Sequence, residues 1–346
     1  MTDMQDYYQP KYLRGAIEKA TPPRTFFRSR FFSRGITFPT ETVSFEFSKS
    51  KRILLPYADE YSVSAPIARE GYQLRTYRAP LITGSRTITP ATLETKSFGE
   101  LEWNSDKTPD ERAKEVAARD LAELQDALFR KLEYMCARVK QDGKLTIDGS
   151  GVSGEVDYQV ANIETVTNAN KWTSTSYDIL GKLAKMARVL RKNGVNPDML
   201  IVGSDVSEAM CVNEGILKLR HDQWVNIPDP ASLEPGIVFL MQIKAPGIYL
   251  NVYEYSEYYA DENGNLVPVI DPDTVIMQSS KERNMMLHGT VTYLNPKTRD
   301  YVSSMSEYVP YVVAEEDPPV RKLVLSSRAL PMPRDNESWY VLKNVA

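Results

Sequence analysis

The sequence is poor in cysteine and histidine, on which many enzymes and small disulfide-bonded domains depend. Cysteine and histidine occur only twice each among 346 residues. Cys136 and Cys211 lie far apart and outside any CxxC spacing, so the sequence predicts neither a disulfide framework nor a zinc site. We therefore expect a protein of a reducing compartment that binds no metal and no other cofactor.

Long apolar runs are also missing. The longest, Ile237–Met241, is far shorter than the roughly 18 residues that a membrane-spanning helix requires. The first residues, Met1–Asp6, have neither the basic start nor the apolar stretch of a secretion signal. We therefore expect no membrane contact and a protein that remains in the cytoplasm where it is made.

The composition that is present is that of an ordinary folded chain, with 42% hydrophobic and 25% charged residues. At about 150 residues per domain, the length corresponds to roughly two structural units with a sizeable core. The net charge of −4 is distributed unevenly, because residues 1–52 are mainly basic whereas residues 254–273 contain acids and no base. We expect these two regions to face different surroundings.

One long helix dominates the predicted secondary structure. Residues 109–141 start with proline, which is favoured at the first helical position, and Gly143 follows the end. At about 1.5 Å per residue, the helix would be roughly 50 Å long, which indicates a strut along an elongated subunit. Its apolar stripe consists of Ala117, Leu121, Leu124, Leu128, Leu132, Met135 and Val139.

Short strands and two further helices account for the remaining segments, which predicts an α+β fold. Strands are expected at 42–47, 72–78, 81–83, 144–148, 155–160, 199–202, within 238–293, and as two or three short strands in 320–345. Helices are expected at 176–193 and from Ser204 through Leu219. The strands before residue 98 are too poor in apolar side chains to form a core alone, so they must lean on another surface, such as a second subunit.

The glycine-rich segment Gly149–Gly154 matches the GxGxxG pattern of dinucleotide-binding proteins. That pattern binds a pyrophosphate only where the third glycine opens a helix, and here a predicted strand follows. A hairpin turn is the favoured interpretation, and a nucleotide-binding enzyme that uses this turn remains an unlikely alternative. No GxxxxGK[ST] motif occurs, so no P-loop is predicted.

Two other patterns fall short of a site. Asp261, Asn263 and Gly264 resemble a calcium loop, but the glycine stands too close to the first aspartate, and a hairpin turn is the better interpretation. A serine nucleophile would need His221 or His288 as its base, and neither histidine has a local catalytic signature. We therefore predict no catalytic residues and no enzymatic activity.

The segment Arg24–Arg34 interleaves four arginines with four phenylalanines and contains no acid. Such a segment could stack on bases and contact phosphates. Alternatively, its phenylalanines anchor an arm on a neighbouring surface while its arginines pair with acids there. The second interpretation is favoured because the whole chain is acidic, whereas a dedicated nucleic-acid binder is usually strongly basic.

Several short motifs follow one another along nearly the whole chain. They are Thr25–Phe32, Phe38–Val43, Ala79–Ile82, Ile88–Pro90, Leu145–Gly149, Tyr258–Gly264, Asp273–Val275, Ala329–Met332 and Trp339–Leu342. In their order and in total length, these motifs resemble the lambda-type phage major capsid proteins, known as the major capsid protein E family. The resemblance implies the Hong Kong 97-like capsid fold and a major capsid protein of a tailed double-stranded DNA phage.

This resemblance also implies a division of the chain and a way of assembling. Copies would form hexamers and pentamers of an icosahedral head shell around the genome. The implied segments are an N-terminal arm at 1–41, an extended loop at 42–98, a peripheral domain at 99–174 with a spine helix at 109–141, an axial domain at 175–310, and a return to the peripheral domain at 311–346. Contacts between subunits are expected at Phe26, Phe27, Arg28, Arg30, Phe31, Phe32, Arg34, Arg69, Tyr72, Arg75, Tyr77 and Arg78.

The partners implied by the resemblance are mostly other copies of the chain. A separate scaffolding protein, a portal and, as an option, a decoration protein would join them, and packaged double-stranded DNA would be held without sequence-specific contacts. The protein would assemble in the host cytoplasm and end in the virion. An encapsulin-like compartment with the same fold around protein cargo is the alternative.

Overall fold

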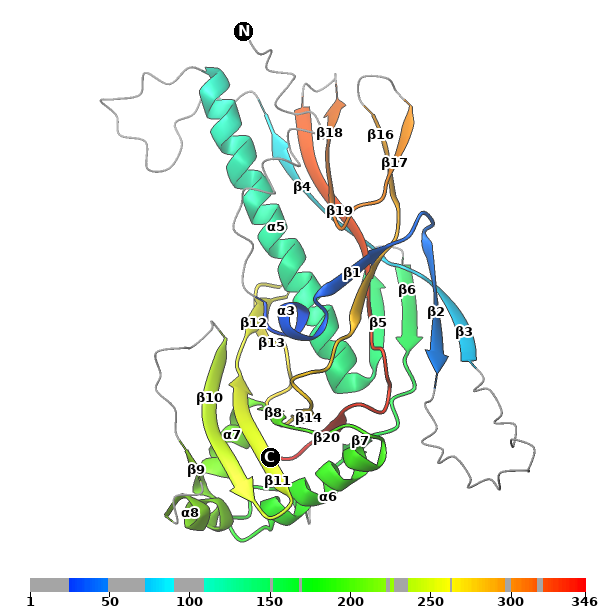
Figure 1. Ribbon diagram of the computed structural model, residues 1–346. Coiled ribbons are helices and arrows are strands. Elements are labelled where there is room, and N and C mark those ends of the chain that lie inside the picture. Colours follow the sequence, from blue (N-terminus) through cyan, green and yellow to red (C-terminus); the bar gives the residue numbers. More distant parts are fainter. Residues whose placement is uncertain are drawn as a thin grey trace, which may run out of the picture.

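The structure is a computed structural model of the chain, and it shows an elongated molecule with a long helix at one end and a large sheet at the other (Figure 1). It describes residues 25–48, 72–89, 109–149, 152–167, 170–221, 225–226, 236–261, 263–295, 300–315 and 320–346. None of the helices among these residues is long and apolar enough to cross a membrane.

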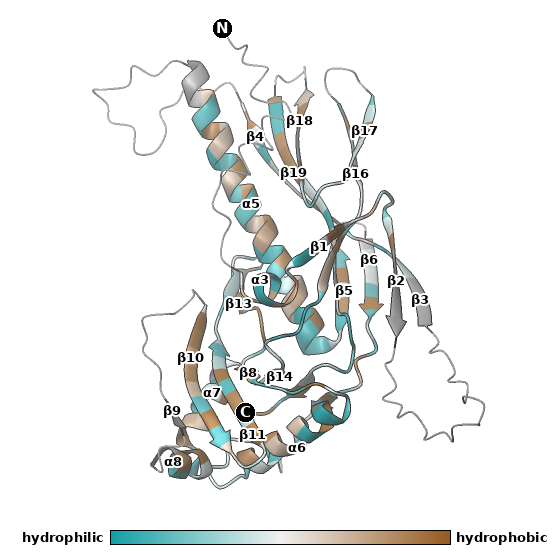
Figure 2. Cartoon of the chain, in the orientation of Figure 1, coloured by the Kyte–Doolittle hydropathy of each residue, from teal (hydrophilic) through white to brown (hydrophobic). Residues whose placement is uncertain are grey.

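Helix α5 (Pro109–Asp142) confirms the predicted long helix, and every residue of its predicted apolar stripe is buried. Apolar and polar residues alternate around it, as expected for a helix with one buried face (Figure 2). The helix ends at Gly143, whose φ of +63° is the left-handed conformation that glycine adopts most readily. The buried face of α5 packs mainly on strands β4 (Leu81–Ile88) and β19 (Val320–Met332).

A five-stranded sheet lies against α5, and β19 is its central strand. The other members are β1 (Arg34–Thr37), β15 (Met285–His288), β18 (Val309–Glu315) and β4, and β19 pairs directly with the last three. Of the two or three short strands predicted in 320–345, the structure has two, and the prediction is wrong only in the length of the first. One strand of 13 residues extends along three partners, and only β20 (Tyr340–Lys343) follows it.

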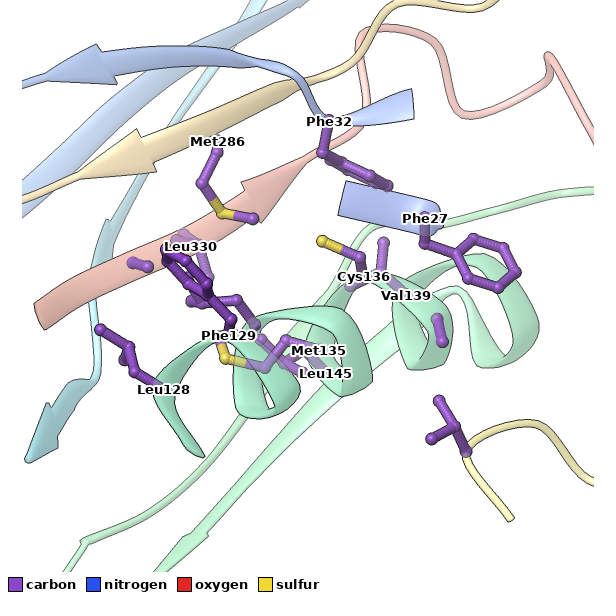
Figure 3. Close-up of a cluster of buried hydrophobic side chains, with 14 of the residues drawn as sticks. Phe27, Phe32, Leu128, Phe129, Met135, Cys136, Val139, Leu145, Met286 and Leu330 are labelled. Carbon is purple, nitrogen blue, oxygen red and sulfur yellow. The ribbon is translucent and has the colours of Figure 1, made fainter. Parts of the chain in front are cut away.

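The side chains between this sheet and α5 form the larger hydrophobic core. Figure 3 shows Leu128, Phe129, Met135, Cys136 and Val139 of α5 meeting side chains from several other elements. Those other side chains are Phe27 and Phe32 of the N-terminal segment, Leu145 of β5 (Lys144–Gly149), Met286 of β15 and Leu330 of β19. At Gly84 of β4, a Cβ atom would lie only 3.1 Å from Leu124, so glycine permits the close approach of strand and helix.

A seven-stranded sheet forms the second unit. Its strands, in spatial order, are β7 (Ile163–Thr165), β20, β14 (Val275–Gln278), β8 (Met199–Val202), β11 (Ile248–Tyr255), β10 (Ile237–Ala245) and β9 (Val225–Asn226). Helices α6 (Ile179–Lys192), α7 (Ser204–Val212) and α8 (Glu214–His221) share a separate hydrophobic core with this sheet. Strand β8 occupies the residues predicted for it, and α6 lies within the predicted helix.

The helix predicted from Ser204 through Leu219 is broken at Asn213. The buried Asn213 side chain accepts hydrogen bonds from the backbone N–H groups of Gly215 and Ile216 and so caps α8. Its amide group also donates to the carbonyls of Thr175 and Tyr177, at 3.0 Å each. This side chain therefore stabilises two short helices in place of one.

The lower end of α5 is fixed by a buried ion pair. Lys140 is fully buried, and its Nζ lies 2.6 Å from Glu282 Oε1 and 3.9 Å from the centre of the Trp339 ring. Trp339 Nε1 donates to the Lys140 carbonyl at 2.9 Å. Burial lowers the pKa of Lys140, and Glu282 opposes that effect. The end of the helix is thereby tied to the chain's last segment.

Four two-stranded ribbons complete the structure. They are β2 (Thr42–Ser48) with β3 (Tyr72–Arg78), β5 with β6 (Val152–Asp157), β12 (Tyr258–Ala260) with β13 (Leu266–Pro268), and β16 (Val291–Leu294) with β17 (Tyr301–Ser304). Strands β2 and β3 were predicted within a residue of their ends. Their ribbon lies at the side of the molecule, away from α5 (Figure 1).

Candidate assembly surfaces

A buried carboxylate anchors the N-terminal segment. Glu133 of α5 accepts hydrogen bonds from the backbone N–H groups of Phe26, Phe27 and Arg28, at 3.0, 2.7 and 2.9 Å. The hydroxyl of Tyr255 donates to the same carboxylate at 3.1 Å. These contacts cap helix α3 (Phe27–Phe31), which no side chain of its own caps. Burial raises the pKa of Glu133, whereas the four hydrogen bonds favour its ionised form.

The four phenylalanines predicted at a subunit interface lie instead in the chain's own core. Phe26, Phe27, Phe31 and Phe32 are all at most 5% exposed. Phe26 and Phe27 pack against the Tyr255 ring, with centroids 5.9 and 5.1 Å away. Within one copy, α5 and β11 supply the core that the segment lacks, so the phenylalanines anchor it to its own chain. Their contact with a second copy stays a prediction.

Arg28 is likewise engaged within the chain. Its guanidinium lies 4.3 Å from the centre of the Phe129 ring and 3.5 Å from the carboxylate of Glu307. His288 is buried beside this pair, and burial lowers its pKa to about 4, with Glu307 opposing the shift and Arg28 adding to it. The acid that pairs with Arg28 therefore comes from the same chain.

Arg30 and Arg34 are exposed and remain available to a neighbouring copy. Arg30 lies over the rings of Phe26 and Tyr253, at 5.7 and 5.6 Å, so its charged end is held at the surface. Arg34 begins β1 at the edge of the five-stranded sheet. Both arginines project from a segment that the Glu133 carboxylate holds in place.

A second carboxylate, that of Glu41, fixes the base of the β2–β3 ribbon. Glu41 accepts hydrogen bonds from Arg78 at 2.8 Å and from Arg328 of β19 at 3.0 Å. Val43 and Ala79 are buried at the same level, and the N–H of Ala79 donates to the Glu41 carbonyl. The ribbon is therefore fixed at its base, while its strands pair only with each other among the described strands.

The other predicted contact residues lie within residues 69–78 of the sequence, and only part of this stretch is described. Tyr77 is half-buried, and its hydroxyl donates to the Asp157 carbonyl at 3.5 Å. Tyr72 and Arg75 lie in β3, but their side chains are outside the part of the chain that the structure describes. Arg69 lies outside it altogether. The sequence offered no signal for Glu133, Glu41 or Arg328, because each acts on residues distant along the chain.

The glycine segment forms the predicted hairpin. Strands β5 and β6 pair antiparallel, with Gly149 opposite Val152 and Ile147 opposite Gly154. Gly154 therefore lies within a strand, so the helix N-terminus that a dinucleotide needs is not at this position. The Asp261 turn is also a hairpin, since its side chain accepts hydrogen bonds from the N–H groups of Asn263 and Asn265. These bonds lower the pKa of Asp261.

Comparison with known protein families gives the decisive observation. Residues 10–344 match the family model described as phage major capsid protein E. This chain belongs to that family. The capsid protein is accordingly a structural protein rather than an enzyme, its copies assemble into a shell, and its place is the virion. No curated protein sequence matches it.

Solved structures agree with the family at the level of the fold. A protein assigned as the capsid protein of a prophage of Escherichia coli CFT073 superposes with a TM-score of 0.67 at 15% identity, over 98% of this chain and 96% of that chain. A phage-related protein of Bordetella bronchiseptica RB50 gives 0.53 at 11% identity, over 97% of both chains. The capsid protein thus has the expected α+β fold of the Hong Kong 97-like type.

An encapsulin is also among the similar solved structures. The SrpI encapsulin of Synechococcus elongatus PCC 7942 has a TM-score of 0.46 at 11% identity, over 96% of this chain and 95% of that chain. A likeness at this level carries no argument about function. The family match therefore decides in favour of a phage capsid.

Proposed function

We propose that the capsid protein is the shell subunit of a tailed double-stranded DNA phage and closes into an icosahedral head of hexamers and pentamers. The family match over residues 10–344 carries this proposal. The β2–β3 ribbon supports it, because a two-stranded ribbon is marginally stable alone and gains stability from a surface on which to rest. A neighbouring copy in the shell supplies such a surface.

The architecture favours an assignment of successive segments of the chain to different parts of the capsid subunit. We assign 1–41 to an N-terminal arm, 42–98 to the extended loop, 99–174 to the peripheral domain with the spine helix, 175–310 to the axial domain, and 311–346 to the return into the peripheral domain. Two details refine this assignment. The arm is anchored in its own chain from Thr25 to Phe38, and β4 belongs to the five-stranded sheet although it lies within the loop.

Basic side chains then make the contacts between copies. Arg30 and Arg34 on the anchored segment, with Arg69, Tyr72, Arg75, Tyr77 and Arg78 of the loop, are assigned to pair with neighbouring subunits. The acids of residues 254–273 are a suitable class of partner, since that stretch contains no base. Exposed ion pairs are individually weak, about 0–1 kcal/mol each, so the shell depends on many of them acting together.

Other partners follow from the same function. A separate scaffolding protein, a portal and, as an option, a decoration protein would complete the head, and assembly would take place in the host cytoplasm. The packaged DNA would be enclosed without sequence-specific contacts. A net charge of −4 suits this task, because an inner wall that bound phosphate strongly would hinder the entry and exit of DNA.

Electron microscopy after expression of the chain, alone and with a scaffolding protein, tests the proposal. Closed shells are the expected result of this expression, and particles purified from infected cells should contain nuclease-protected DNA. Shells filled with a protein cargo would favour the encapsulin alternative, and only small soluble oligomers under all conditions would overturn both. Arg34→Glu should lower the yield of shells, whereas Arg34→Lys, which keeps the charge, should not.

A further inference from the structure

The β16–β17 ribbon presents an exposed face with three large apolar side chains, which lie outside the hydrophobic clusters formed by the described residues. Leu294 and Tyr301 are directly opposite each other in the antiparallel register, and they are 50% and 82% exposed. Met305, just after β17, is 59% exposed. The same outer face also contains Thr292 and Ser303, whose hydroxyls are hydrogen-bonded at 2.9 Å. The described residues of this face contain no charged side chain.

The inner face of the ribbon already accounts for its attachment to the body. Val291 and Tyr293 are buried in a small separate cluster with Val309 of β18. The Tyr293 ring stacks on that of Tyr311, with centroids 5.0 Å apart and planes at 16°. Since strands alternate faces, Leu294 and Tyr301 point away from this cluster. Their exposure therefore contributes nothing to the folding of the isolated chain.

We infer that this outer face, formed by Thr292, Leu294, Tyr301, Ser303 and Met305, is a contact between copies of the capsid protein, an inference that rests on the proposed shell function. Paired cross-strand side chains hold a tyrosine and a leucine rigidly, and tyrosine is enriched at the centres of protein interfaces. The uncharged character of the described face does not suit DNA, which requires basic side chains. A second protein surface does suit it.

The size of the face selects the kind of partner. Even three fully buried aromatic side chains would cover only about 450–750 Å², so one tyrosine, one leucine and one methionine, each partly exposed, fall below the roughly 800 Å² per partner of a stable binary complex. A contact this small holds only when other contacts join the same two molecules. Copies within a shell meet this condition, because each copy touches its neighbours at several places at once.

Hydroxyl-radical labelling read by mass spectrometry tests the assignment on the full-length protein. Tyr301 and Met305 should be labelled several-fold less in purified shells than in unassembled subunits, while the buried Phe27 stays unlabelled in both. Equal labelling of Tyr301 in the two states would overturn the inference. So would protection that appears only when a different head protein is added. Shell formation by the unaltered chain tests the proposed function separately.

Substitutions provide a second measurement. The double variant Leu294→Ser with Tyr301→Ser should leave the melting temperature of the subunit nearly unchanged and should make shells dissociate at lower guanidinium concentration. Arg86→Gln, at an exposed pair with Glu123 outside this face, is the control, and Tyr301→Phe, which keeps the aromatic ring, should behave like the unaltered protein. Shells of the double variant that resist guanidinium as well as unaltered shells would contradict the assignment.

Discussion

Glu133 accepts a hydrogen bond from the backbone N–H of Phe27 at 2.7 Å, although the two residues are 106 positions apart. The carboxylate serves as the cap of α3 and at the same time fixes the arm to the middle of the long helix. A single side chain of α5 thus determines where the N-terminal segment leaves the body. The exposed arginines that follow are positioned by this contact.

Replacing Glu133 should release the segment. Glu133→Gln puts an amide donor among N–H donors and removes the charge, so we expect a loss of about 1–3 kcal/mol in the free energy of unfolding. Urea denaturation of the subunit measures the loss. Glu123→Gln on the same helix is the control, because Glu123 pairs with Arg86 at the surface and should contribute under about 1 kcal/mol. Equal effects of the two variants would contradict the role assigned to Glu133.

The buried Lys140–Glu282 pair should show strong coupling. Lys140→Met alone leaves the Glu282 carboxylate buried without its partner, and we expect a loss of about 3–5 kcal/mol. Adding Glu282→Leu should recover most of that loss, since replacing both members of a buried pair is often neutral. Denaturant midpoints of the two single variants and the double variant measure the coupling. Additive losses would show that the two side chains act independently.

The root of the β2–β3 ribbon should loosen when Glu41 loses its charge. Glu41→Gln weakens the contacts with Arg78 and with Arg328, which is only 11% exposed. We expect a modest loss of about 1 kcal/mol in subunit stability and faster amide hydrogen exchange along the ribbon. Arg86→Gln, at an exposed pair elsewhere, is the control. An unchanged rate of amide hydrogen exchange in β2 and β3 would contradict the role of Glu41 in fixing the base of the ribbon.

Acidification should destabilise the subunit partly through His288. Its pKa of about 4 in the folded protein lies below the ordinary histidine pKa of about 6.5, so the unfolded state binds more protons than the folded state between these pH values. The contribution of His288 to the free energy of unfolding is therefore complete above pH 6.5. It falls by up to about 3 kcal/mol as the pH drops to 4. Urea titrations of the unaltered subunit and His288→Gln across this range should converge toward low pH. If the free energies of unfolding of the two proteins changed in parallel with pH, His288 would be excluded as a source of the pH dependence.

The sequence predicted elements whose pattern is local and missed those set by distant contacts. The stripe of α5 and the strand β8 follow from spacing within their own residues, and both were found where expected. The break at Asn213 depends on carbonyls of Thr175 and Tyr177, which lie far back along the chain. The Glu133 anchor of the Phe26–Phe32 segment was missed for the same reason, because Glu133 is 106 positions from Phe27 in the sequence.

The central position of β19 has a consequence for synthesis on the ribosome. Its pairing with β4 joins residues as remote as Thr83 and Ser326, whose hydroxyls are hydrogen-bonded although they are 243 positions apart. The five-stranded sheet can therefore close only when translation is almost finished, and until then the apolar face of α5 lacks β19, one of its two main packing partners. A messenger RNA truncated before codon 320 would yield a fragment that lacks β19. Such a fragment would aggregate through the exposed apolar face of α5 and could not assemble into the shell.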